Sequence, residues 1–158
     1  MTGKIAVGGI TRIDDLVLVR ILGAQTGHGL AGRALSGLGL KGINIICVTS
    51  FIDRDGLNNL GFAIKEADLD QALGILQSIR DDLQAKGIEY QRCCTVISIY
   101  GPHFSERPAI AGTAFQATGD AAIQIHMICT SFSTVSFVIG EDQAELAVDK
   151  LQEYFLVP

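Results

Sequence analysis

A short glycine-rich loop at residues 25–30 is the first segment whose residue types could bind a ligand. Its members are Gln25, Thr26, Gly27, His28, Gly29 and Leu30. The two glycines allow a ligand to approach the backbone closely. The segment that follows predicts a helix, and the N–H groups at a helix start attract an anion such as a carboxylate. The loop is therefore a candidate binding site, and a plain turn is the alternative interpretation.

Two predicted strand starts carry polar side chains between isoleucines. One is Ile43-Asn44-Ile45 and the other is Ile123-Gln124-Ile125. The side-chain amides of Asn44 and Gln124 can each donate and accept hydrogen bonds, which suits the charged ends of a small polar ligand. We include Asn44, Ile45, Ile123, Gln124 and Ile125 among the candidate site residues. A simple edge or turn position is the alternative for Asn44.

Residues for catalysis or metal binding do not cluster in the sequence. The cysteines are Cys47, Cys93, Cys94 and Cys129. Adjacent cysteines cannot form the spaced pair of a zinc site, and no histidine lies at ligand spacing to them. No glycine-rich phosphate loop with a following Lys-Ser or Lys-Thr is present. We therefore expect no catalytic residues, no metal and no cofactor, and a chain that is not an enzyme.

The elements that would position the loop occur twice along the chain. The first copy predicts strands at 16–22, 43–51, 57–64 and 88–92 and helices at 29–40 and 69–83. The second copy predicts strands at 95–100, 122–131 and 134–139 and helices at 108–119 and 141–155. The order β-α-β-β-α-β is that of a ferredoxin-like fold, with helices on one face of an antiparallel sheet. We predict an α+β protein of two such modules, residues 1–92 and 93–158, with exchange of short terminal strands left open.

Composition excludes several classes of partner. The 158 residues carry 12 basic and 17 acidic side chains, a net charge of −5. Without a basic patch, nucleic acid is not an expected partner. No apolar run approaches the roughly 20 residues of a membrane span, and the N-terminus lacks a signal-peptide core. We therefore expect a cytoplasmic protein that does not bind membranes.

With the repeat aligned, five segments match one known family in the same order. They are the Gly23–Gly29 loop, Ile43-Asn44-Ile45, Ser105-Glu-Arg-Pro108, Met127-Ile-Cys-Thr-Ser131, and Ala147-Val-Asp-Lys-Leu-Gln-Glu-Tyr-Phe155. Together they resemble the tandem ACT-domain regulatory region of aspartate kinase, over nearly the whole chain. Some positions depart from the family pattern. Thr26 stands at the family's loop aspartate, Ser50 and Phe51 at a Gln-Asn pair, and Phe132 at a glutamate.

The resemblance implies a non-catalytic regulatory module that binds a free amino acid, lysine, threonine or similar. The effector would lie between the first loop of one ACT domain and the strand start of a partner domain. Ser50 is one of the residues expected to bind it. The resemblance further implies a homodimer that acts by allosteric change on an aspartate kinase catalytic subunit, which is either supplied in trans or fused to this module in the natural protein. The departures favour an alternative, a ligand-free dimerisation or scaffold subunit for a partner kinase.

Overall fold

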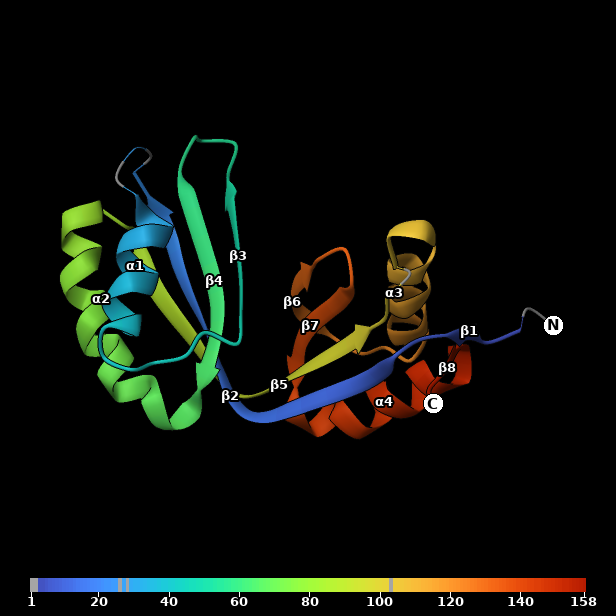
Figure 1. Ribbon diagram of the computed structural model, residues 1–158. Coiled ribbons are helices and arrows are strands. Elements are labelled where there is room, and N and C mark those ends of the chain that lie inside the picture. The colour runs from blue at the N-terminus through green and yellow to red at the C-terminus, as the bar shows by residue number, and fades with distance from the viewer. Residues whose placement is uncertain (1–2, 26, 28, 103) are drawn as a thin grey trace. The chain divides into compact units, whose positions relative to one another are not determined.

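A computed structural model describes residues 3–25, 27, 29–102 and 104–158, and these divide into two compact units. One unit is Asp15–Arg92, and the other joins the residues up to Asp14 with Cys93–Pro158. Two long strands, β2 (Gly9–Ala24) and β5 (Gly87–Tyr100), contribute to both units (Figure 1). Each strand has a left-handed residue where it passes between units, Asp15 with φ 57° and Cys93 with φ 55°.

The unit of residues 15–92 is a four-stranded sheet with two helices. Its strands follow the order β3-β4-β2-β5, with β3 at Cys47–Ile52 and β4 at Asn58–Lys65. The helices are α1 (Leu30–Gly39) and α2 (Leu69–Leu83), and a short 3-10 turn, η1 (Glu66–Asp68), precedes α2. Antiparallel pairing of β3 with β4 places Ile52 opposite Asn58, so the connection between them is a tight hairpin turn.

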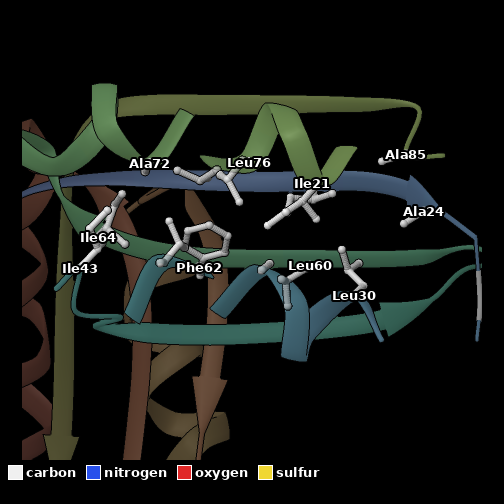
Figure 2. Packing of buried hydrophobic residues seen from close by; sticks show 14 of the residues in the cluster. Ile21, Ala24, Leu30, Ile43, Leu60, Phe62, Ile64, Ala72, Leu76 and Ala85 are labelled. Atoms are coloured by element: carbon white, nitrogen blue, oxygen red, sulfur yellow. The ribbon is translucent and has the colours of Figure 1, made fainter. Parts of the chain in front are cut away.

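The core of this unit lies between the sheet and its two helices. Alternate residues of a strand point to opposite faces, so every second side chain of β2 and β4 reaches the helices. These include Val17, Val19, Ile21, Leu60, Phe62 and Ile64, which form one cluster with Leu30, Leu38, Ala72 and Leu76 (Figure 2). All of these side chains are at most 4% exposed. Burial of this cluster holds α1 in place although its sequence contains three glycines.

The second unit repeats this arrangement and adds a pair of short strands. Its sheet order is β2-β5-β7-β6, with β6 at Ile125–Thr130 and β7 at Thr134–Gly140. The helices are α3 (Ile110–Asp120) and α4 (Ala144–Tyr154), and 3-10 turns lie at η2 (Phe104–Glu106) and η3 (Glu141–Gln143). Its core includes Phe137, whose ring meets Phe115 edge-on at 5.8 Å between centroids.

The short strands tie the two ends of the described chain together within this unit. Strand β1 (Ile5–Ala6) pairs in parallel with β8 (Phe155–Leu156), so Ile5 lies opposite Phe155. The backbone N–H of Val7 donates to Leu156 O at 3.0 Å, and that of Gly8 donates to Tyr100 O at 2.7 Å. The residues up to Asp14 therefore pack with the second copy of the repeat.

The predicted fold class is confirmed, because each unit combines an antiparallel sheet with two helices in the ferredoxin-like order. Most element bounds differ by a few residues from the sequence-based ones, and the largest difference is at β2, which begins at Gly9 and not at residue 16. The strands expected at 88–92 and 95–100 are one strand, β5, because the left-handed Cys93 bends the strand without ending it. The helix expected at 141–155 begins as η3, and its last residue, Phe155, already belongs to β8.

Candidate functional site

A pocket of about 240 Å³ lies at the N-terminal end of α1. Its lining comes from the glycine loop, the first turn of α1, and the facing ends of β3 and β4. The residues are Gly29, Leu30, Ala31, Gly32, Ser50, Asn58 and Leu60. Leu30 and Leu60 are 4% and 2% exposed, and they join the pocket to the core. Figure 2 shows these two side chains near each other, toward one end of the core.

The start of α1 is built to face an anion. Gly29 is the N-cap residue and has φ 65° and ψ 42°, a left-handed conformation that glycine adopts without strain. As a glycine it offers no side-chain acceptor to the first-turn N–H groups, and that turn contains no acidic residue. The partial positive charge of the helix start therefore points at the pocket.

Polar groups from the sheet face this helix end. Ser50 pairs with Leu60 in the β3–β4 ladder, and Ile52 pairs with Asn58, so Ser50, Asn58 and Leu60 share the helix-covered face. The hydroxyl of Ser50 and the amide of Asn58 supply acceptors opposite the helix N–H groups. The pocket thus combines donors for a carboxylate, acceptors for an ammonium, and two apolar side chains.

Three of the candidate residues predicted from the sequence, Gly29, Leu30 and Ser50, line this pocket. Gln25 is exposed, and its backbone N–H donates to Leu83 O at 3.1 Å, which ties the loop to the end of α2. Gly27 is exposed with φ 84°, and an added Cβ would meet no atom within 4 Å. Thr26 and His28 lie outside the described residues.

Asn44 and Ile45 lie away from the pocket within their own unit. Asn44 is exposed and follows the C-terminal end of α1, whereas the pocket lies at its N-terminal end. Ile45 is half-buried against the core. Figure 2 shows Ile43, the residue before Asn44, at the opposite end of the core from Leu30. A ligand in the pocket would not reach Asn44 of the same unit.

The corresponding strand start of the other unit is part of its own packing. Ile123 is 6% exposed, and its N–H donates to Thr118 O at 3.0 Å. Gln124 is exposed, and its N–H donates to Gln143 Oε1 at 3.1 Å. Ile125 packs against the core of the unit. The structure does not gather these three residues around a pocket.

The first loop of the second copy lines a separate pocket of about 300 Å³. Its lining residues are Ala6, Val7, Gly8, Gly101, Pro102, Phe104, Arg107 and Ile110. Sequence reasoning did not include them, because the residues before β2 close this pocket through long-range pairing with Tyr100 and Leu156. Its lining is mainly apolar, and Arg107 supplies the single charged side chain among the described lining residues.

The hairpin beside the first pocket is held by Asp53 and Asn59. The carboxylate of Asp53 accepts the backbone N–H of Asp55 at 2.9 Å and that of Leu57 at 3.0 Å, and the amide of Asn59 at 3.1 Å. These hydrogen bonds, the one from Asn59 first, hold the pKa of Asp53 below its ordinary value. Sequence reasoning missed both Asn58 and Asn59. The Asp-Arg-Asp-Gly turn nevertheless already placed residue 58 beside the end of β3.

The described part of the chain has no cluster of three or more His, Cys, Asp or Glu side chains that could hold a metal ion. Among the same residues, no helix is both long and apolar enough to cross a membrane.

The chain is similar to known proteins along nearly all of its length. The family model of the ACT domain matches residues 97–155. Aspartokinase 2 of Bacillus subtilis is 29% identical over 157 residues, and an aspartokinase of Bacillus sp. strain MGA3 is 28% identical over 156. Both alignments cover 98% of this chain but only 38% of the relative. The chain therefore spans well under half the length of the curated relatives it matches.

Solved structures match the fold over the same extent. The regulatory subunit of aspartate kinase from Thermus thermophilus superposes with a TM-score of 0.85 at 21% identity, covering 95% of this chain and 99% of that subunit. Aspartate kinase from Synechocystis superposes with a TM-score of 0.87 at 25% identity, covering 96% of this chain and 28% of that enzyme. The match is thus to the regulatory part of these enzymes and not to their catalytic domain. Residues 97–155 match the ACT-domain family model, and the whole chain has the fold of the regulatory subunit of aspartate kinase.

Proposed function

We propose that this protein is the regulatory module of an aspartate kinase and binds one small, neutral amino acid in the pocket at the start of α1. The observation that carries the proposal is the lining of that pocket. The first turn of α1, with its backbone N–H groups, lines one pocket of about 240 Å³ together with Ser50 and Asn58. This arrangement suits the carboxylate and ammonium that every free amino acid carries.

Size and charge of the pocket favour a threonine-like effector over lysine. Pockets for drug-sized ligands occupy roughly 300–1,000 Å³, so this smaller volume suits a single amino acid. None of the described lining residues carries a charged side chain. In the adjoining turn, the carboxylate of Asp53 is already engaged by three hydrogen bonds. A lysine ammonium would therefore find no counter-charge among these residues, whereas a neutral side chain needs none.

The proposal includes a homodimer in which effector binding favours one arrangement of ACT domains over another, because only differential affinity shifts an equilibrium. Asn44 and Gln124 would then meet an effector held by a second protomer. The edge strand β3 supports an association between copies, since Phe51 and Ile52 are 61% and 64% exposed there.

A catalytic subunit in trans and a cytoplasmic location complete the proposal. One solved neighbour contains aspartokinase alpha and beta subunits, and this chain covers 97% of the matched chain at a TM-score of 0.84. None of the four cysteines takes part in a disulfide, as is usual for proteins of a reducing compartment.

Calorimetric titration with threonine, lysine, methionine and the remaining amino acids tests this function, with the sedimentation mass recorded in each case. We expect saturable binding of a neutral amino acid. The variants Ser50→Ala and Asn58→Ala should weaken it by about tenfold or more, because each removes one polar partner. Ser36→Ala, an exposed position on α1 outside the pocket, is the matched control and should bind normally. Tighter binding of lysine than of threonine would contradict the neutral class.

A scaffold that binds no metabolite is the second candidate function. The exposed Phe51 and Ile52 on β3 favour it, since a hydrophobic edge suits permanent association and Phe51 stands where the family pattern has a polar residue. A stable dimer that gives no heat with any amino acid would support this candidate and reject the sensor.

A further inference from the structure

Asn59 forms a buried hydrogen-bond link between the glycine loop and the β3–β4 hairpin. The side chain is only 6% exposed. Its Oδ1 accepts the backbone N–H of Gly23 at 3.0 Å. Its Nδ2 donates to Asp53 Oδ2 at 3.1 Å and to Leu57 O at 3.2 Å. One amide thus joins the end of β2 to the turn that precedes β4.

The link lies at an irregularity of the sheet. Ile21 pairs with Leu60 and Ala24 with Asn58, so β2 contains one residue more than β4 between these pairs. Such a bulge leaves a backbone N–H without its regular partner. Gly23 lies in the bulge with φ +64°, and Asn59 accepts its N–H with a side chain in place of a backbone carbonyl. The loop therefore begins at a position set by Asn59.

Asn59 cannot touch an occupant of the pocket. Side chains alternate along a strand, and the neighbouring Asn58 and Leu60 both line the pocket on the helix-covered face. Asn59 points to the other face, where it meets Gly23 and Asp53. Any influence on binding must pass through the backbone that it holds.

We propose that Asn59 is a positioning residue, which sets the glycine loop against Asn58 at the distance that an amino-acid effector requires. The inference rests on the proposed function for its effect on affinity, and on the structure alone for its effect on the loop. Asp53 shares the role, because it orients the Asn59 amide while its other oxygen accepts the N–H groups of Asp55 and Leu57.

The test compares Asn59→Ala with a variant that exchanges the two side chains, Asp53→Asn combined with Asn59→Asp. The exchange keeps an acceptor for Gly23 and restores a hydrogen bond between positions 53 and 59 with its direction reversed, and of the three hydrogen bonds of Asn59 it loses only the donor to Leu57 O. Ile64→Val serves as the control, because it weakens the same core away from the loop at a comparable cost in stability. Urea unfolding places all variants on one stability scale.

Two readouts separate positioning from stability. The first is hydrogen exchange of the Gly23 and Gln25 amides by NMR, which needs no ligand. We expect faster exchange in Asn59→Ala, recovery in the exchanged pair, and no local change in Ile64→Val. Unchanged Gly23 exchange in Asn59→Ala would overturn the inference, whether or not the protein binds an amino acid.

The second readout is threonine titration. We expect Asn59→Ala to weaken binding at least about tenfold, the exchanged pair to regain most of it, and Ile64→Val to remain within about twofold of the wild type. Equal losses in Asn59→Ala and Ile64→Val would reduce Asn59 to a structural residue and overturn the inference. Absence of threonine binding in the wild type would count against the proposed function, and the exchange data would still decide the role of Asn59 in the loop.

Discussion

The hydroxyl of Thr95 donates a 2.7 Å hydrogen bond to Asp14 Oδ1, which also accepts the guanidinium of Arg12 at 2.8 Å. Thr95 is fully buried on β5, and Asp14 precedes the left-handed Asp15 on β2. The hydrogen bond therefore fixes the two strands at the point where both leave their unit.

Thr95→Val should destabilise the protein by about 1–3 kcal/mol, because it removes a donor to a charged group at nearly constant volume. Urea unfolding measures the change. Thr130→Val, at an exposed position on β6, is the control and should change the free energy of unfolding by less than about 0.5 kcal/mol. Equal effects of the two variants would show that the Thr95 hydroxyl contributes nothing specific.

Stability should fall in acid partly through Asp53. Its folded-state pKa is lowered, so its carboxylate stabilises the fold above the unfolded value, near pH 3.9, and this contribution disappears as pH falls through the folded-state pKa. Asp53→Asn should therefore be less stable than wild type at pH 7, and the gap should close as the solution becomes strongly acidic. Urea midpoints at several pH values give the curve. A gap that stays constant with pH would contradict the assignment.

Two phenylalanines, one buried and one exposed, offer a matched pair. Phe137 is 0% exposed and contacts the Phe115 ring, whereas Phe132 is 87% exposed in the connection between β6 and β7. Phe137→Ala should cost about 3–5 kcal/mol through the cavity it leaves, and Phe132→Ala should cost close to nothing. Thermal or urea unfolding compares them. A large loss with Phe132→Ala would indicate that this side chain is covered in the assembled protein.

A carboxylate introduced into the neutral pocket should change its preference. Asn58→Asp places a negative charge among the lining residues and should strengthen lysine binding relative to threonine by about tenfold. Competitive titration of the two amino acids measures the ratio. Asp55→Asn, an exposed change in the adjoining turn, is the control and should leave the ratio unchanged. A ratio that does not move in Asn58→Asp would place the effector side chain elsewhere.

Local signals in the sequence account for most of the fold. The apolar stripe from Leu69 to Leu83 predicts α2, and the Asp-Gly pair at residues 55–56 predicts the hairpin that the structure contains. In contrast, the pairing of β1 with β8 brings Ile5 opposite Phe155, and neither segment carries a local signal for the other. Cys93 is a similar case, because its positive φ follows from the sheet and not from a residue type that favours it.

The candidate site was predicted in part for the same reason. The glycine loop can be recognised from its composition alone, and two of its residues, Gly29 and Leu30, line the pocket. Asn58 lines it only because the β3–β4 register places Ile52 opposite Asn58, and Asn59 matters only because β2 contains a bulge. Both depend on how strands align, which composition does not reveal. The roles of Asn44 and Gln124 stay predictions that depend on a second protomer.

The division of the chain into a continuous unit and an interrupted one sets an order of events during synthesis. Residues 15–92 contain every segment of their own unit, so this unit can fold as soon as it leaves the ribosome. The residues up to Asp14 emerge earlier, but their partners, Tyr100 and Phe155–Leu156, are made only after residues 15–92. Strand β1 must therefore stay unpaired until β8 has been made, so the interrupted unit closes only after the continuous one is complete.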